Sequence, residues 1–264
     1  MNVGLCSPRP ILESCRLDGH EYQIDPYVGC EHDCRYCYAL NRAESDWTRR
    51  ILVHPDLERR LAFELENVAP QSIYLGMNSD PYQPVEETRL QTRRVLEMLV
   101  DRGFSVCVLT KSPRIVRDVD LFLEMPDAYL GVSIAFGDET DRRRFEPAAP
   151  PNEARVHALR TLKSAGLRTY VLVCPVMPHI TDVERIVADI AGWVEHAYVY
   201  RLRMERETDV NWRNVERVLK RHYPDLVDAY RGAAFSDVDP YWRDLRSRLA
   251  ALAPPDSVEL SIEV

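Results

Sequence analysis

Three cysteines lie close together in the chain, with the spacing C-x3-C-x2-C over Cys30, Cys34 and Cys37. Thiolates held this near to one another repel, and a bound metal centre removes that repulsion. Cysteine thiolates are ligands of both zinc sites and iron–sulfur clusters. The three residues therefore predict a metal centre in this loop.

The number of thiolates favours an iron–sulfur cluster over zinc. A cubane [4Fe–4S] cluster is normally completed by four cysteines, and this loop supplies three, so one iron would be free to bind another molecule. A structural zinc site needs four nitrogen or sulfur ligands. His32 could be recruited as the fourth, but zinc motifs usually contain paired cysteines or a distant histidine pair, and the sequence has no second pair. We therefore expect Cys30, Cys34 and Cys37 to hold a [4Fe–4S] cluster.

A disulfide is disfavoured, because three is an odd number and the first residues lack the basic and apolar regions of a secretory signal. Seven cysteines without such a signal fit a reducing compartment, so we expect a cytoplasmic protein. No apolar stretch reaches the roughly 20 residues that span a bilayer, and we expect no membrane contact. The formal net charge of −8 argues against a protein that binds a polyanion over its whole surface.

The elements around the loop predict an α/β fold. The length of 264 residues suits one α/β barrel domain. Short β-type runs alternate with helical periodicity, which indicates a parallel sheet with right-handed crossovers. Thr181 and Glu184 have capping-box spacing, which predicts Thr181 as a helix N-cap. The predicted strands are 22–28, 72–78, 105–110, 129–135, 169–176 and 197–204, and the predicted helices are 57–68, 89–102, 115–125, 153–165 and 182–194.

This alternation fits either a barrel or a doubly wound open sheet. In both folds the functional groups lie at the carboxyl ends of the strands, and the cysteine loop follows the first predicted strand. We expect residues 1–20 to form an N-terminal extension, residues 21–205 to form the barrel, and residues 206–264 to form a mostly helical extension that packs on it.

The cysteine spacing, with Tyr36 directly before the last cysteine, resembles the signature of the radical S-adenosylmethionine (SAM) enzymes. The resemblance implies a partial (β/α)6 barrel and a free iron that chelates the methionine end of SAM. It also implies that one electron from the cluster cleaves SAM to a 5′-deoxyadenosyl radical, which abstracts a hydrogen atom from a substrate. The implied protein partner is an electron donor such as flavodoxin or ferredoxin.

Further motifs resemble the spore photoproduct lyase branch of this superfamily, with order and spacing kept. They are Tyr27-Val28-Gly29-Cys30, Cys37-Tyr38, Asn78-Ser79-Asp80, Leu109-Thr110-Lys111, Val132-Ser133-Ile134, Phe145-Glu146-Pro147 and Arg221-His222-Tyr223-Pro224. Taken alone, residues 78–80 also fit a polar turn, and Lys111 fits a solvated lysine. The resemblance implies that the Tyr36 ring packs against the adenine of SAM, and that the other SAM contacts come from Asn78, Ser79, Asp80, Lys111 and Ser133.

Met77 departs from this branch. The DNA repair enzyme of the branch carries a cysteine at the corresponding position, and its thiol returns a hydrogen atom to the repaired thymine. A methionine thioether has no S–H to give, so photoproduct repair itself is disfavoured. Tyr38 resembles a tyrosine of the hydrogen-return path, and Cys174 lies near the end of a predicted strand. Both are candidate catalytic residues, although Cys174 also fits a small buried residue.

The remaining cysteines are expected to have no part in the reaction. Cys107 lies four residues before Lys111, which places it roughly 13 Å lower in the barrel, in the core. Cys6 and Cys15 precede the barrel, and two ligands are too few for a second cluster.

Two groups of arginines are expected near the mouth of the barrel. There they would bind phosphate or carboxylate groups or form a solvated rim, so an anionic substrate such as a nucleotide, nucleic acid or modified peptide is compatible with them. The sequence does not indicate the oligomeric state. The arginines are Arg142, Arg143 and Arg144 in one group, and Arg201, Arg203 and Arg206 in the other.

Two other classes of function share the cysteine motif. A non-enzymatic redox or oxygen sensor would bind a cluster, and a nucleic-acid module would bind zinc. Asp80, Lys111 and Ser133 discriminate against the sensor, because a sensor does not need a SAM-binding site. The zinc module would lack the broad absorption at roughly 420 nm that thiolate-ligated iron–sulfur clusters show. The sequence therefore predicts a radical SAM enzyme with an unidentified substrate.

Overall fold

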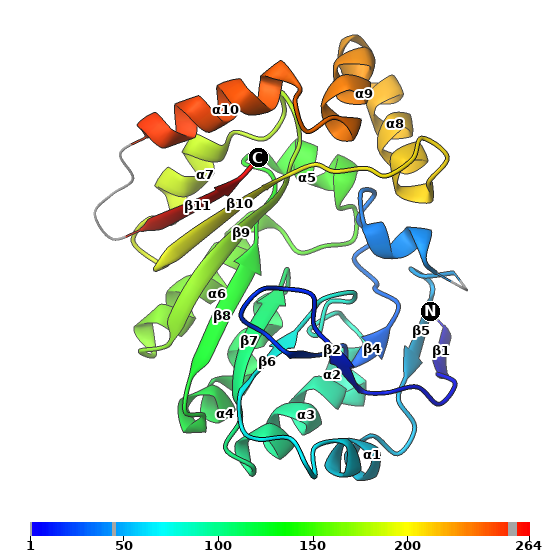
Figure 1. The fold of residues 1–264 in the computed structure, drawn as a ribbon, viewed down its shortest axis with the longest axis vertical. Helices are drawn as coiled ribbons and strands as arrows, with labels where there is room; N and C mark the ends of the chain where they lie inside the picture. The colour runs from blue at the N-terminus through cyan, green and yellow to red at the C-terminus, as the bar shows by residue number, and fades with distance from the viewer. Residues whose placement is uncertain (1, 44–45, 253–257) are drawn as a thin grey trace.

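The computed structural model describes residues 2–43, 46–252 and 258–264, and at its centre is a sheet of eight strands (Figure 1). Across the sheet the strands lie in the order β11-β10-β9-β8-β7-β6-β3-β2. Their bounds are β2 Leu12–Ser14, β3 Tyr22–Ile24, β6 Ser72–Leu75, β7 Ser105–Thr110, β8 Ala128–Ser133, β9 Arg168–Val176, β10 His196–Arg201 and β11 Glu259–Glu263.

The strand order identifies this sheet as a partial barrel. From β3 to β11 the spatial order follows the chain order, and each strand pairs in parallel with the next. Strand β2 is antiparallel to β3 at one edge. A doubly wound sheet would reverse its order at a switch point, so that alternative is excluded. In the described residues β2 and β11 do not pair with each other, and the barrel is open. The predicted fold class is confirmed.

Helices cover the outer face of this sheet because its outward-pointing side chains are apolar. Val132, Val171 and Val173 share one buried core with the apolar face of α7. Among the described helices, none has the length and apolar composition to cross a membrane. The helices between the strands are α1 Leu57–Glu64, α2 Glu86–Arg89, α3 Gln91–Val100, α4 Val119–Glu124, α5 Glu139–Phe145, α6 Asn152–Ser164 and α7 Val183–Ile190, with 3-10 helices η1 Tyr38–Asn41 and η2 Pro113–Asp118.

The N-cap of α7 differs from the prediction. The cap is Asp182, whose side chain accepts a hydrogen bond from the Arg185 backbone nitrogen at 3.0 Å. The Thr181 hydroxyl instead donates to the Ala135 carbonyl and accepts from the Met177 nitrogen, each at 2.8 Å. Thr181 therefore joins the ends of two neighbouring strands, and tertiary contacts override the local capping pattern.

The C-terminal region is mostly helical, and it also adds a strand that the sequence analysis did not predict. Strand β11 pairs in parallel with β10 and extends the sheet (Figure 1). Its alternating apolar residues Val258, Leu260, Ile262 and Val264 were the available signal. The helices before it are α8 Val210–His222, α9 Val227–Phe235 and α10 Pro240–Ala251, with η3 Pro224–Leu226 between the first two.

The first predicted strand divides into two pieces that belong to different sheets. β3 ends at Ile24, and β4 (Tyr27–Val28) joins a small sheet with β5 (Arg50–Val53) and β1 (Asn2–Leu5). The break falls at Asp25 and Pro26, where proline lacks the backbone donor that a ladder needs. The chain thus leaves the barrel sheet just before the cysteine loop, and the small sheet fixes where that loop begins.

Candidate functional site

A cavity of about 340 Å³ lies at the carboxyl ends of the central strands, between them and the cysteine loop. Its lining contains every one of the predicted site residues, although they come from five separate segments of the chain. These residues are Cys30, Cys34, Tyr36, Cys37, Tyr38, Asn78, Ser79, Asp80, Lys111, Ser133 and Cys174.

The three cysteines of the loop are partly exposed and face this cavity. Burial raises the pKa of Cys30 to about 12, and it also raises the pKa of Cys34 and of Cys37. Three such thiolates would be stable only beside a cationic centre, and the donor set of three thiolates fits an iron–sulfur cluster. In the described part of the chain, no three His, Cys, Asp or Glu side chains converge as ligands of a single metal ion do. The thiolates that hold an iron–sulfur cluster need not converge on one point, because each of them binds a different iron.

His32, the alternative fourth ligand, points to a carboxylate. Its imidazole is buried, and Nε2 lies 3.1 Å from Oδ2 of Asp80. The pairing gives His32 a structural function within the loop.

Asp80 joins three segments of the site through its buried carboxylate. Oδ1 accepts hydrogen bonds from the Thr110 hydroxyl (2.6 Å) and the Tyr82 backbone nitrogen (2.8 Å), and Oδ2 accepts one from the Lys111 backbone nitrogen (2.7 Å). Burial acts to raise the pKa of Asp80, but the His32 charge and these hydrogen bonds outweigh it and lower the pKa to about 2. Both oxygens already have partners in the protein, so Asp80 anchors the site, and its contact with SAM stays a prediction.

Asp25 is a site residue that the sequence analysis missed. Its carboxylate accepts hydrogen bonds from the backbone nitrogens of Asn78 (2.9 Å) and Ser79 (3.1 Å) and from the Asn78 side-chain amide (2.7 Å). The Ser79 hydroxyl donates to the Tyr27 carbonyl at 2.7 Å. The polar turn after β6 is therefore fixed to the segment that precedes the cysteine loop.

Lys111 lies in a buried polar network at the back of the cavity. Its ammonium donates to the Ser133 hydroxyl at 2.8 Å and lies 3.7 Å from Oε1 of Glu146. Glu146 accepts hydrogen bonds from Arg155 (2.5 Å) and from the Tyr36 hydroxyl. Burial acts to raise the pKa of Glu146, but Arg155 and Lys111 outweigh it and lower the pKa to about 2. The network thus holds Lys111 and Tyr36 in place with ionised partners.

Arg155 could have been noticed in the sequence. It shares one face of α6 with Ala158, Leu159 and Leu162, at the spacing of a buried helical face, and it is itself completely buried. An arginine at such a position needs a buried carboxylate, and Glu146 supplies it.

Tyr38 and Cys174 both line the cavity near Met77. The Tyr38 hydroxyl donates to the Met77 carbonyl and lies 3.4 Å from the Asn78 amide oxygen. Burial raises the pKa of Cys174 to about 11, so its thiol keeps its proton at neutral pH. The Tyr38 phenol and the Cys174 thiol thus line the same cavity as Met77, whose thioether has no hydrogen atom to donate.

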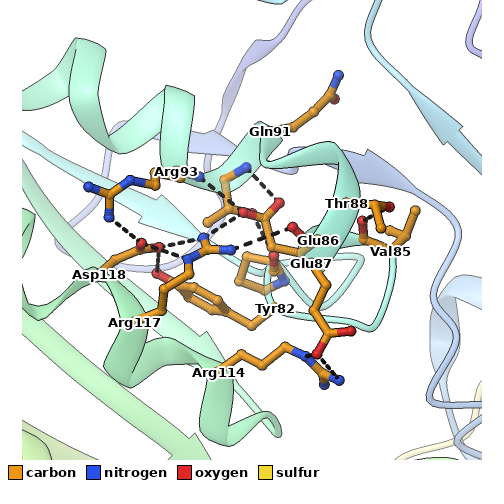
Figure 2. Close-up of polar contacts among 12 residues, drawn as sticks. Tyr82, Val85, Glu86, Glu87, Thr88, Gln91, Arg93, Arg114, Arg117 and Asp118 are labelled. Carbon is orange, nitrogen blue, oxygen red and sulfur yellow. Dashed lines mark hydrogen bonds and ion pairs between the residues drawn. The ribbon is translucent and has the colours of Figure 1, made fainter.

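A buried polar cluster around α2 fixes the entry to the cysteine loop (Figure 2). The completely buried carboxylates of Glu86 and Asp118 lie 2.6 and 2.7 Å from the Arg117 guanidinium, and Arg93 lies 2.8 Å from Asp118. The Tyr27 hydroxyl donates to Glu86. The cluster therefore ties α2 to strand β4, which leads directly to Cys30.

Gln83 holds both sides of Cys30. Its amide nitrogen donates to the Gly29 carbonyl (2.9 Å), and its amide oxygen accepts from the Glu31 nitrogen (3.0 Å). The Glu31 carboxylate accepts in turn from the Val85 nitrogen at 2.5 Å. The segment after β6 thus supports the cysteine loop as well as the polar turn at residues 78–80.

The arginines predicted at the barrel mouth divide into three kinds. Arg201 and Arg203 line the cavity, and Arg201 pairs with Asp237 at 2.5 Å. The expectation for Arg142 is wrong, because it is buried and bonds to the Glu146 and Ala149 carbonyls, where it holds the loop after α5. The other three are Arg206, which pairs with Asp209, and Arg143 and Arg144, which lie outside this cavity.

The remaining cysteines lie away from the cavity lining. Cys107 is buried beside Tyr74 and Tyr170, as predicted. Cys6 lies 3.5 Å from the His54 ring, and the Cys15 sulfur accepts from the Leu17 nitrogen at 3.4 Å. Neither belongs to a group of metal ligands within the described residues.

The chain matches a known protein family and is similar in sequence to several known proteins. Residues 24–190 match the sequence pattern of the Radical SAM superfamily. An uncharacterized protein of Methanocaldococcus jannaschii is 29% identical over 224 residues, which cover 82% of each chain. A radical SAM Nalpha-GlyT isomerase of Pseudomonas phage M6 is 22% identical over 217 residues, which cover 78% of this chain and 44% of the phage protein.

The fold is similar to that of spore photoproduct lyase. A mutant of that enzyme with dinucleoside spore photoproduct superposes with a TM-score of 0.71 over 98% of this chain and 80% of the other, at 18% identity. This similarity confirms the predicted architecture.

The buried pair of Glu146 and Arg155 gives a prediction about stability. In Glu146→Leu the buried guanidinium loses its carboxylate, and we expect the free energy of unfolding to fall by about 3–5 kcal/mol. Arg155→Met should cost a similar amount for the same reason. The double variant should lose less than the sum of the two, because neither Glu146 nor Arg155 is left to lack the other, although Lys111 still loses its contact with Glu146. Urea unfolding followed by circular dichroism measures all three, and strictly additive losses would show that the pair is not coupled.

Proposed function

The chain belongs to the radical SAM superfamily, and on that premise we propose that it cleaves SAM reductively at a [4Fe–4S] cluster to remove a hydrogen atom from an anionic substrate. The observation that carries the proposal is the convergence of eleven predicted residues on one cavity. Cys30, Cys34 and Cys37 would hold the cluster, which when bound would supply the electron that cleaves SAM to a 5′-deoxyadenosyl radical. An electron donor such as a flavodoxin or ferredoxin would reduce it.

The polar side chains of the cavity are suited to hold SAM. The Lys111 ammonium is the cation for its carboxylate, and Glu146 and Ser133 keep that ammonium charged and oriented. Burial acts to lower the pKa of Lys111, but Glu146 and Cys34 outweigh it and raise the pKa above its usual value. The turn at Asn78 and Ser79, fixed by Asp25, would receive the amino group. The Tyr36 ring is one wall for the adenine, and its hydroxyl is held by Glu146.

The non-enzymatic sensor is less well supported by the same observation. A sensor needs a cluster but no cavity beside it, and it has no use for a buried lysine at the cavity wall. No feature of the described residues favours that alternative.

A nucleotide or nucleic acid is the substrate class that the cavity favours. The exposed Arg203 and the paired Arg201 give its rim positive charge that suits phosphate groups. Spore photoproduct lyase, whose fold is similar, has been solved as a mutant with dinucleoside spore photoproduct. Met77 places a thioether where that branch has its hydrogen-donating thiol, so the reaction on this substrate would differ from photoproduct repair.

Production of 5′-deoxyadenosine tests the proposal. The protein would be reconstituted anaerobically with iron and sulfide, reduced with dithionite and supplied with SAM. We expect slow formation of 5′-deoxyadenosine without substrate, and in Cys34→Ala a fall to the level of the protein-free control. Cys107→Ala is the matched control, because it removes a cysteine outside the cavity and should leave the rate unchanged. A stable cluster that neither cleaves SAM nor responds to it would contradict the proposal.

Cys174 and Tyr38 would differ as hydrogen donors in that assay. The S–H and phenolic O–H bonds are similar in strength, but a thiol transfers its hydrogen atom to a carbon-centred radical faster than a phenol does, so a thiol within reach is the preferred donor. In D2O both groups carry deuterium, and transfer from either labels 5′-deoxyadenosine at its 5′ carbon. We expect Cys174→Ala to lower the labelled fraction, and Cys107→Ala to leave it unchanged. Mass spectrometry measures the fraction. A fall in Tyr38→Phe alone would assign the donor to Tyr38.

A further inference from the structure

A second cavity, of about 490 Å³, lies between α5 and α8, apart from the cavity that contains the predicted site residues. Five of its lining residues are arginines, and none is an aspartate or glutamate, although the whole chain carries a net charge of −8. We call this cavity the arginine groove. Its lining is Arg35, Thr140, Arg143, Arg144, Pro147, Asn214, Arg217, Val218, Arg221 and His222.

Much of the charge in the arginine groove is not balanced by the protein. Within the described ranges, Arg143, Arg217 and Arg221 take part in no ion pair, and all three are exposed. In the part of the chain that the structure describes, the hydrogen-bond partner of the Arg217 guanidinium is the neutral amide oxygen of Asn214, at 3.3 Å.

The other two arginines of the lining, Arg35 and Arg144, are each paired with a carboxylate. Arg35 lies 3.1 Å from Asp33, and Arg144 lies 3.2 Å from Asp141. These carboxylates do not line the groove, so they leave its surface positive.

The helix dipole explains only part of this charge. Cations in the last turn of a helix offset the partial negative charge of its free carbonyls, and Arg221 and His222 lie in the last turn of α8. Arg143 and Arg144 likewise lie in the last turn of α5, but Arg217 lies a full turn before the end of α8 and Arg35 belongs to the cysteine loop. Desolvation lowers the pKa of His222, and the charges of Arg144 and Arg221 lower it further.

We propose that the arginine groove binds the phosphate backbone of a nucleic-acid strand. The inference rests on the proposed function and deepens it, because it says how a nucleic-acid substrate is held beside the cavity. A single phosphate group carries a charge of about −2 at most, which cannot balance the arginines of the groove. Successive phosphodiesters can, since each takes one cation and releases its counterion.

The geometry of the groove suits a backbone rather than bases. Arg217 and Arg221 are four residues apart on one face of α8, which separates them by about 6 Å along the helix axis, so they can contact different phosphates. No Phe, Tyr or Trp side chain lines the groove, whereas proteins that bind the bases of single strands stack them on aromatic rings. Binding should therefore depend strongly on salt and weakly on sequence.

The groove also adjoins the proposed active site. Arg35 lies in the cysteine loop between Cys34 and Tyr36, and both of those residues line the first cavity. A strand held in the groove would lie against the loop that carries the cluster.

Salt-dependent binding tests the inference. A fluorescent single-stranded DNA of about ten nucleotides, within the range of known single-strand sites, would be titrated with the reconstituted protein at several salt concentrations. The test variant is Arg143→Ala/Arg217→Ala/Arg221→Ala. Its control, Arg59→Ala/Arg102→Ala/Arg243→Ala, removes the same charge from exposed positions outside the groove. Arg35 is left unchanged because it lies between cluster residues.

We expect the groove variant to bind more weakly, with a slope of log affinity against log salt that is smaller by about 2, as the loss of three single-strand phosphate contacts predicts. The control variant should keep the wild-type slope. Equal loss in both variants, or an unchanged slope in the groove variant, would overturn the inference. So would groove-dependent binding of a phosphopeptide or of anionic vesicles without binding of DNA.

A separate readout distinguishes failure of the inference from failure of the proposed function. The groove variant should still form 5′-deoxyadenosine without substrate, which also shows that it is folded. If the wild type binds DNA through the groove but forms no 5′-deoxyadenosine, the groove inference holds and the proposed reaction fails. If the wild type forms 5′-deoxyadenosine but does not bind DNA, the proposed reaction holds and the groove inference fails.

Discussion

The buried carboxylate of Asp80 connects the segments from which the rest of the site is built. It contacts His32 in the cysteine loop, the turn at Tyr82, and the end of β7 at Thr110 and Lys111. A buried charge is costly unless donors surround it, so each of these segments must stay in place to keep the carboxylate satisfied. Asp25 and Gln83 add further hydrogen bonds between segments. Asp25 fixes the polar turn after β6, and Gln83 fixes the backbone around Cys30. The geometry at the cysteines thus depends on polar groups whose side-chain atoms already have partners within the protein.

Much of the fold and the site could be predicted from the sequence, because the signals involved are local. Five of the six predicted strands appear at or near their expected positions, whereas the first divides into β3 and β4. The spacing of the three cysteines identifies their loop without any tertiary information. Strand β11 was missed even though its residues alternate, because a short terminal strand has little pattern to set against the helices before it. The parts that escaped prediction are set by tertiary contacts. Thr181 joins two strand ends instead of capping α7, and Asp25 functions through a turn more than fifty residues away.

The charged residues of the chain are used in three physically different ways. Glu146 and Arg155 are completely buried and neutralise each other behind Lys111. Glu86 and Asp118 hold the entry to the cysteine loop through Arg117. In the arginine groove, three of the five arginines face solvent without a carboxylate partner among the described residues, although the chain as a whole is acidic. Sequence patterns alone grouped Arg142 with its neighbours Arg143 and Arg144, but only burial distinguishes the first, which is structural, from the others.

The central claim is that SAM binds at a cluster held by Cys30, Cys34 and Cys37, against the wall that carries Lys111 and Asn78. Electron–nuclear double resonance on the reduced, reconstituted protein tests it most directly, with SAM isotopically labelled in its amino and carboxylate groups. The account predicts that SAM changes the electron paramagnetic resonance signal of the cluster and that the labelled nitrogen and oxygen show hyperfine coupling to it. A reduced cluster whose signal is unaffected by saturating SAM, with no coupling to either label, would contradict the account.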